Sequence, residues 1–209
     1  EKKSKGNLYP PIPQVDDLDW KDFHGINYIG WDYYVLNSKL KKLSSSSYEK
    51  KKLLISLGGS DAVGLERIIL KLIPKLITDF NIDFVVGPLS DGSEIEELRN
   101  KYDGLIIHHN FIDLLGAAQI ALVTYGVTVY ELAFLEVPTL IISTCNDHKV
   151  SGKIFWGKYS GFCHVPINSN NFEGKIINCL NNLNETEKHT FPVYKAGINN
   201  NIINIIRDI

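Results

Sequence analysis

Residues 121–138, ALVTYGVTVYELAFLEVP, decide the fold of this chain. The stretch begins with a continuous apolar run, passes through a turn at Gly126, and continues with the spacing of an amphipathic helix. A strand that enters a small-residue turn at a helix N-terminus leaves several backbone N–H groups unpaired. Such groups, together with the helix dipole, suit a phosphate. The stretch therefore predicts a strand, a turn that could hold an anion, and a helix.

The same letters have a second interpretation. Thr128 is followed three residues later by Glu131, which is the pattern of a capping box. In that arrangement Thr128 caps the helix and Glu131 reaches back to the Thr128 N–H. The stretch alone does not decide between a helix cap and a ligand site, so the choice depends on the rest of the chain.

From residue 52 onward, short apolar runs alternate with longer stretches of helical spacing. This alternation predicts βαβ crossovers and an α/β fold with a Rossmann-like, doubly wound parallel sheet. A second capping box, Ser93 to Glu96, starts one helix, and Pro74 is expected to kink another. The expected strands are residues 53–57, 82–86, 105–107, 120–123 and 139–142. The expected helices are residues 65–80, 93–102, 112–118, 129–135, 147–159, 172–183 and 198–209.

The first fifty residues lack periodic apolar positions. We therefore expect two parts: residues 1–50 as an N-terminal extension and linker, the remnant of an inter-domain segment, and residues 51–209 as the Rossmann-like domain. Residues 25–36 are rich in aromatic side chains, which predicts a short strand and a segment that packs against a neighbouring domain.

Composition limits the class of protein. A formal net charge of -2 gives no basic surface for nucleic acid, so no nucleic-acid partner is expected. The three cysteines, an odd number without metal-ligand spacing, predict small buried apolar residues in a reduced, cytoplasmic setting. No apolar run reaches the roughly 18 residues of a membrane span. Membrane association of the full-length protein stays open.

Ligands of such sheets bind beyond the carboxyl ends of the strands, near a switch in strand order. Five loops should lie there: residues 58–61, 87–88, 108–111, 124–128 and 143–148. Gly58, Gly59 and Ser60 could receive phosphate or sugar oxygens, although a tight turn explains a double glycine equally well. Adjacent residues of an extended segment point to opposite faces, so His108 and His109 do not predict a metal site. No catalytic residue, metal or cofactor is assigned.

Taken together, these loops resemble a known family. The segments LLISLGGSD (53–61), HHNFID (108–113) and AAQIALVTYGVTVYELAFLEVP (117–138), with the Asn146–Asp147–His148 loop, are similar to the C-terminal half of the GT-B nucleotide-sugar enzymes. The likeness is to the group of spore-coat polysaccharide and pseudaminic-acid-pathway proteins, which includes a UDP-sugar hydrolase. This group is related to the lipid II-forming N-acetylglucosaminyltransferase, and the resemblance covers residues 25–161.

The resemblance implies roles for particular residues. In the family, the glycine turn holds the diphosphate and the helix glutamate binds the ribose, while the loop after the third strand covers the uracil. The double-glycine loop approaches the sugar phosphate, and the polar loop after the fifth strand contacts the sugar. The positions that correspond are Gly126, Val127 and Thr128 for the diphosphate, Glu131 for ribose, Phe111 and Ile112 for uracil, Gly58, Gly59 and Ser60 for the sugar phosphate, and Asn146 and His148 for the sugar.

The resemblance thus implies a UDP-sugar-binding domain of a glycosyltransferase-like enzyme of polysaccharide or modified-sugar biosynthesis. The alternatives are a UDP-sugar hydrolase of the pseudaminic-acid type and a non-catalytic domain that has lost its nucleotide. Two departures favour the last: Tyr125 stands where the family has a small residue, and Asp147 replaces a glutamine. The helix at 112–118 is also about one turn short.

In this family the catalytic base lies in an N-terminal domain, and no matching segment precedes Gly25. The chain begins at Glu1 and contains no methionine. We therefore expect a fragment of a longer protein, or a sequence from which methionine has been lost, with the N-terminal domain as the missing partner.

Overall fold

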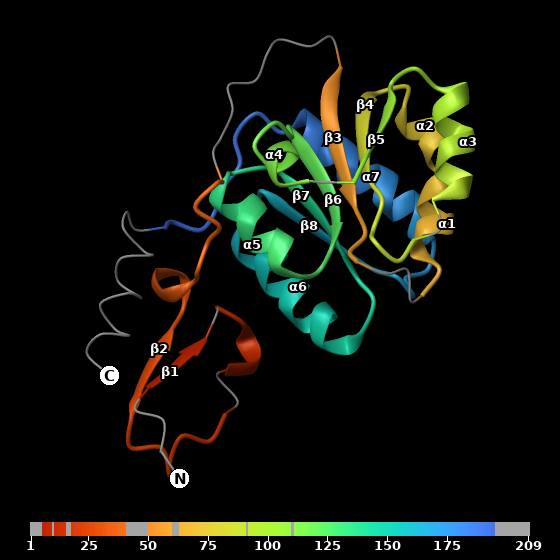
Figure 1. The fold of residues 1–209 in the computed structure, drawn as a ribbon. Coiled ribbons are helices and arrows are strands. Elements are labelled where there is room, and N and C mark those ends of the chain that lie inside the picture. The colour runs from red at the N-terminus through yellow and green to blue at the C-terminus, as the bar shows by residue number, and fades with distance from the viewer. Residues whose placement is uncertain are drawn as a thin grey trace. The chain divides into compact units, whose positions relative to one another are not determined.

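A computed structural model describes residues 6–9, 11–15, 18–40, 50–59, 63–90, 92–109 and 111–194 (Figure 1). The chain divides into two compact units, Glu1–Ser38 with Pro192–Ile209, and Lys39–Phe191. The helix expected at 198–209 lies outside the described residues. In the described part, no helix has the length and apolarity needed to cross a membrane.

The smaller unit contains a two-stranded parallel sheet. Strand β1 (Gly6–Tyr9) pairs with β2 (Ile26–Ile29), and the 3-10 turns η1 (Pro13–Val15) and η2 (Trp31–Tyr33) flank it. The aromatic side chains of the expected packing segment contact one another within this unit. The rings of Tyr28 and Tyr33 lie 5.3 Å apart, and those of Trp31 and Tyr194 lie 5.0 Å apart.

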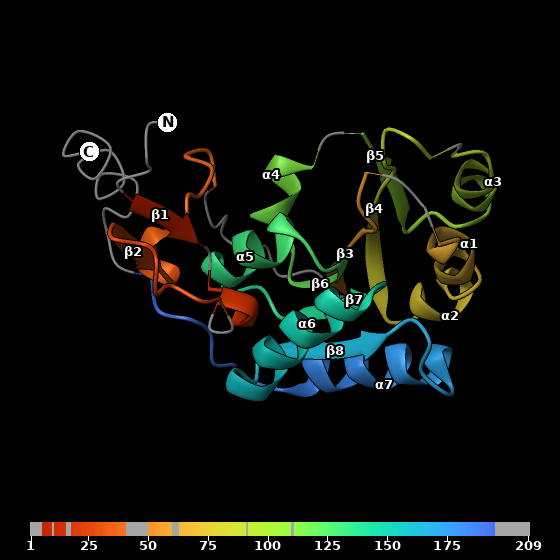
Figure 2. The same ribbon diagram turned by 90° about the horizontal axis from the view of Figure 1, so that it is seen from below.

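The larger unit is a six-stranded parallel sheet with helices on both faces (Figure 2). Its strands lie in the order β5-β4-β3-β6-β7-β8, which is that of a Rossmann fold and confirms the predicted class. The strands are β3 (Lys51–Ser56), β4 (Phe80–Val85), β5 (Leu105–His108), β6 (Ile120–Thr124), β7 (Thr139–Ser143) and β8 (Phe162–Pro166). The pattern of short apolar runs predicted the first five and missed β8, in which His164 and Pro166 interrupt the apolar letters.

The helices follow the predicted positions with two differences. The expected helix at 65–80 is divided into α1 (Leu65–Leu70) and α2 (Ile73–Leu76), because Pro74 lacks the N–H that a continuous helix needs and instead occupies the first turn of α2. Helix α4 is a single turn. The others are α3 (Ser93–Lys101), α4 (Ile112–Leu115), α5 (Val127–Phe134), α6 (Asn146–Lys158) and α7 (Phe172–Glu185).

The core of this unit lies mainly on one face of the sheet. Alternate residues of the strands point there and pack against α1, α2, α3 and α7, as the shared burial of Leu53, Phe84, Ile69 and Ile176 shows. Cys163 and Cys179 are half-buried against this core, but Cys145 is exposed, so the expectation that all three cysteines are buried was wrong for Cys145.

Candidate functional site

The candidate site lies at the edge of the sheet where all six strands end. Because every strand pair is parallel, the loops that follow the five predicted strands leave from this one edge, as expected. Strands β3 and β6 are neighbours at the centre, with β4 and β5 on one side and β7 and β8 on the other. The order in which the chain adds strands switches from one side of β3 to the other at this pair, and ligands of doubly wound sheets bind at such a switch point.

Two glycine loops pack closely at this switch in strand order. Gly58 has a φ of 93°, and a Cβ added to it would lie 3.3 Å from Thr124 Oγ1. A Cβ on Gly87 would lie only 2.5 Å from the Gly58 carbonyl oxygen. The Leu89 N–H also donates a hydrogen bond of 3.1 Å to Gly59 O. The structure therefore brings the loops after β3, β4 and β6 together; Ser60 lies outside the described residues.

Helix α5 begins at Val127, with Gly126 at its N-cap and no capping hydrogen bond from a side chain. The predicted capping box was wrong, because Thr128 lies inside the first turn and Glu131 is buried instead of reaching back. The predicted cap at Ser93 is likewise wrong, since Gly92 precedes α3 without a side-chain cap.

The start of α5 has open hydrogen-bonding capacity. The first internal bond of this turn runs from the Val129 N–H to Gly126 O, at 3.1 Å. In the described part of the chain, the N–H groups of Gly126, Val127 and Thr128 have no acceptor. A Cβ on Gly126 would meet no atom of the described residues within 4 Å. Three consecutive N–H groups thus face unfilled space at the positive end of a helix dipole.

Glu131 lies one turn further along α5 and is the most unusual side chain of the site. Only 8% of its surface is exposed. Among the described residues, its carboxylate has no hydrogen-bond or ion-pair partner, and burial raises its pKa. Buried carboxylates are nearly always paired, because desolvating an ionised group without a partner is costly. Among the described residues, Glu131 is therefore a buried carboxyl group whose hydrogen-bonding capacity is unsatisfied.

Tyr125 is held by side chains of α5 and α6. Its hydroxyl lies 2.6 Å from the hydroxyl of Tyr130, and its ring centre lies 5.6 Å from that of His148. Burial raises the pKa of Tyr125, and hydrogen bonds with Tyr130 and Ser151 oppose this effect in part. Neither Tyr130 nor Ser151 was predicted from sequence, because the pairing depends on how α5 and α6 pack.

The two residues expected to contact the sugar have different surroundings. His148 lies beside Tyr125, and its Nδ1 is 3.2 Å from Thr144 Oγ1. Asn146 lines a pocket of about 310 Å³ at the ends of β7 and β8. Asp147 is exposed in the first turn of α6, where the helix dipole favours a negative charge, which gives this acidic residue a structural reason. The pocket is lined by Ser143, Thr144, Cys145, Asn146, Lys149, Pro166, Ile167 and Asn168.

Beside this pocket, His164 of β8 makes the stability of the domain depend on pH. Its Nε2 lies 2.9 Å from Ser143 Oγ. Burial, and secondarily the charge of Lys149, lower the pKa of His164 from 6.5 to about 4. Between these values the unfolded chain binds a proton that the folded chain does not, so stability falls as the pH drops from 6.5 toward 4.

We expect His164→Gln to reduce this loss of stability between pH 7 and pH 5, because glutamine does not titrate and can still hydrogen-bond Ser143. Urea unfolding of both proteins at the two pH values measures the effect. His109→Gln is the control, since His109 is exposed. An unchanged pH dependence in His164→Gln would contradict the assignment.

Phe111 and Ile112 follow β5, and both are half-buried. Two strands, β4 and β3, separate β5 from β6. With about 4.8 Å between neighbouring strands, these residues lie roughly 14 Å across the sheet from the turn at Gly126. The predicted site residues therefore form a row along the sheet edge instead of one compact pocket. In the described part of the chain, no group of three His, Cys, Asp or Glu side chains could hold a metal ion.

No family model matches the chain. It is 28% identical over 138 residues to the spore coat polysaccharide biosynthesis protein SpsG of Bacillus subtilis, a match that covers 61% of this chain and 40% of SpsG. It is 26% identical over 129 residues to the pseudaminic acid cytidylyltransferase and UDP-2,4-diacetamido-2,4,6-trideoxy-beta-L-altropyranose hydrolase of Helicobacter pylori. That match covers 61% of this chain and 24% of the relative.

Among solved structures, the glycotransferase of kitacinnamycin matches 94% of this chain with a TM-score of 0.61 and 17% identity, over 47% of its own length. The chain therefore has the fold of a GT-B glycosyltransferase domain and is distantly homologous to proteins of sugar biosynthesis. It spans less than half the length of each of these relatives.

Proposed function

We propose that this chain, a GT-B-type domain, binds the nucleotide of a UDP-sugar in an enzyme of polysaccharide or modified-sugar biosynthesis. The observation that carries the proposal is the pairing of two open groups at the switch in strand order. Three backbone N–H groups lack acceptors, and one helical turn away a buried carboxylate lacks a donor, among the described residues. A nucleoside diphosphate supplies what both lack, since its phosphates accept hydrogen bonds and its ribose hydroxyls donate them.

The diphosphate is assigned to the turn at the start of α5. The N–H groups of Gly126, Val127 and Thr128 bind its oxygens, and the helix dipole stabilises their charge without a metal ion. Gly58 and Gly59 bring backbone close to the same position from β3. As the sugar leaves, negative charge grows on the β-phosphate, so fixed donors at this turn stabilise the leaving group in the transition state.

The nucleoside is assigned to the β5 side of the edge. Glu131 accepts from the ribose hydroxyls, and Phe111 with Ile112 covers the uracil. The spacing of roughly 14 Å between β5 and β6 suits an extended nucleotide that lies along the edge. Asn146 and His148 contact the sugar. The contact of the Tyr125 hydroxyl with Tyr130 supports an arrangement in which this side chain packs against α5 while the nucleotide occupies the turn.

The chemistry of the whole enzyme requires more than this chain. Activation of the acceptor hydroxyl, or of water, needs a general base, and we assign it to a separate N-terminal domain. The same nucleotide-binding half serves transfer and hydrolysis equally. Incubation of the full-length protein with UDP-sugars, with and without an acceptor, separates the two activities.

Isothermal titration calorimetry with UDP tests the proposal. A folded chain should bind UDP saturably with one site, and inorganic pyrophosphate should bind more weakly at the same site. Absence of binding by the folded protein contradicts the proposal and favours the alternative of a domain that has lost its nucleotide.

A further inference from the structure

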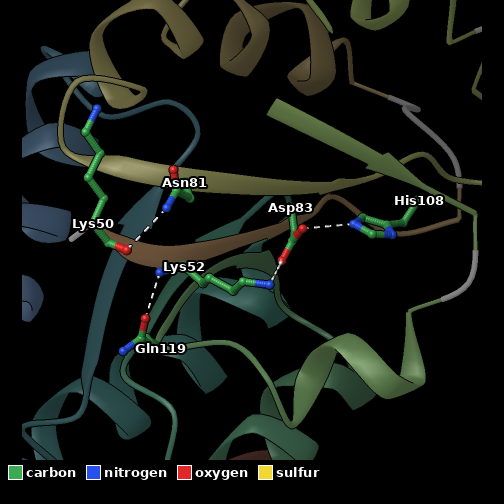
Figure 3. Close-up of polar contacts among 6 residues, drawn as sticks. All are labelled: Lys50, Lys52, Asn81, Asp83, His108 and Gln119. Atoms are coloured by element: carbon green, nitrogen blue, oxygen red, sulfur yellow. Dashed lines mark hydrogen bonds and ion pairs between the residues drawn. The ribbon is translucent and has the colours of Figure 1, made fainter. Parts of the chain in front are cut away.

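A chain of polar side chains crosses three strands of the sheet on the face opposite the main core (Figure 3). Asp83 of β4 is only 5% exposed. Its Oδ1 lies 2.9 Å from His108 Nε2 on β5, and its Oδ2 lies 3.7 Å from Lys52 Nζ on β3. Lys52 and His108 are each displaced by two residues from the register partner of Asp83, so the three side chains run diagonally across the sheet.

These contacts anchor both ends of one connection. The segment 109–119 leaves β5 at the carboxyl edge and returns to the opposite edge to begin β6. His108 immediately precedes this segment and is bound to Asp83. Gln119 ends it, and its side chain accepts a hydrogen bond of 3.0 Å from the Lys52 N–H, while its own N–H donates to Lys52 O at 3.1 Å. We call Lys52, Asp83, His108 and Gln119 the crossover clamp.

The His108 end of the crossover clamp lies close to the residues assigned to the base. Phe111 and Ile112 lie three and four residues beyond His108, at the N-cap and first position of α4, and this single helical turn is the regular structure described between His108 and Gln119. A connection this short has little regular structure of its own to fix its path. Its position therefore depends on the anchors at its ends. A buried carboxylate that contacts a histidine and a lysine at once specifies one arrangement, since a buried polar group that loses its partner is costly.

We propose that Asp83 is a positioning residue for nucleobase recognition. It acts through His108 and Lys52 to fix residues 111–119, and thereby the side chains of Phe111 and Ile112 that cover the base. This inference rests on the proposed function, because it assigns a nucleoside to the β5 side of the edge. Asp83 itself does not touch the ligand.

The test compares a ligand that has a base with one that lacks it. UDP and inorganic pyrophosphate are titrated into the wild-type chain, Asp83→Asn, His108→Leu and His108→Gln. Asp83→Asn and His108→Leu should weaken UDP binding about tenfold, since small misplacements of positioning groups have effects of this order. Pyrophosphate affinity should stay within about twofold, because the phosphate turn is distant and independent. His108→Gln should retain wild-type affinity, since its amide N–H can still donate to Asp83.

Amide hydrogen exchange gives a readout that does not depend on UDP. Exchange in residues 109–119 should accelerate in Asp83→Asn and His108→Leu, and unchanged exchange there would overturn the clamp. Leu180→Ala controls for general destabilisation, since Leu180 is a fully buried core residue of α7 outside the clamp.

Three binding outcomes distinguish the positioning role of Asp83 from the proposed UDP binding. Selective loss of UDP affinity supports the positioning role. Equal loss of UDP and pyrophosphate, or an equal loss in Leu180→Ala, overturns that role while the proposed function stands. Failure of the wild-type chain to bind UDP overturns the proposed function and the nucleobase role with it.

Discussion

Replacing Glu131 by methionine is expected to stabilise the free domain and to weaken UDP binding about a hundredfold. Glu131 is 8% exposed and lacks a partner among the described residues, so the folded state bears the cost of a desolvated carboxylate. Methionine has a similar volume and no such cost. The free energy of unfolding should rise by about 1–3 kcal/mol. Hydrogen bonds to charged groups contribute about 1.5–3 kcal/mol each, so loss of the ribose contact accounts for the affinity.

The pH dependence of this effect has a definite sign. Because burial raises the pKa of Glu131 above its ordinary 4.5, the folded chain holds a proton that the unfolded chain has already released. In that range stability falls as the pH rises. The advantage of Glu131→Met should therefore be small near pH 4 and grow as the pH rises above 4.5, until the carboxylate of the folded wild-type chain is fully ionised.

Urea unfolding from pH 4 to pH 8 and UDP calorimetry at pH 7.5 measure both effects. Glu97→Met is the control, since Glu97 is an exposed carboxylate on α3 and its removal should change neither quantity. A Glu131→Met protein that is less stable than wild type would show that the carboxylate has a partner in the folded chain. An unchanged UDP affinity would remove Glu131 from the site.

Replacing Gly87 by alanine is expected to disrupt the loops that meet at the switch in strand order. The new Cβ would lie 2.5 Å from Gly58 O and 3.2 Å from the carbonyl carbon and oxygen of Gly59. These are backbone atoms, so relief requires that the loops after β3 and β4 separate. We expect a loss of about 1–3 kcal/mol in the free energy of unfolding, as for other overpacked sites. UDP affinity should fall as well, because the Gly58–Gly59 loop moves.

Gly59→Ala is the matched variant for this experiment. Among the described residues, a Cβ at Gly59 has no neighbour within 4 Å, so we expect the folded chain to accept it with almost no change in stability. Chemical unfolding and UDP calorimetry on both variants separate the two roles of the loop. If Gly59→Ala binds UDP less tightly at unchanged stability, the loop approaches the ligand directly. If Gly87→Ala is as stable as wild type, the packing of the two loops does not hold the site together.

Sequence patterns predicted most of the sheet because strands buried on both faces are continuous apolar runs between turn residues. They missed β8, where His164 bonds to Ser143 and is tolerated in the interior for that reason. They also misassigned the start of α5. A Thr-x-x-Glu pattern forms a capping box only if the glutamate side chain can reach back to the first N–H of the helix. Tertiary packing buries Glu131, and the local sequence pattern does not predict that packing.

The site was predicted in outline but not in its supporting contacts. The loops could be placed because parallel strands end at one edge, whatever their order. The contact between Asp83 and His108 could not be predicted, since the two residues are 25 positions apart and their contact depends on the register of β4 and β5. The engagement of Tyr125 by Tyr130 was also hidden. From sequence, Tyr125 argues against a ligand in the turn, and the letters do not show that its hydroxyl contacts that of Tyr130.

The strand order has a mechanical consequence. Among the described residues, strands β5, β4 and β3 form one half of the sheet and β6, β7 and β8 the other, and the ladder of β3 with β6 joins them. The candidate site lies where the paired strands β3 and β6 end. The Gly58–Gly59 loop comes from one half of the sheet and the turn at Gly126 from the other. A nucleotide that binds both loops would connect the two halves of the sheet. Its binding energy would then resist separation of β3 from β6 under force or on heating.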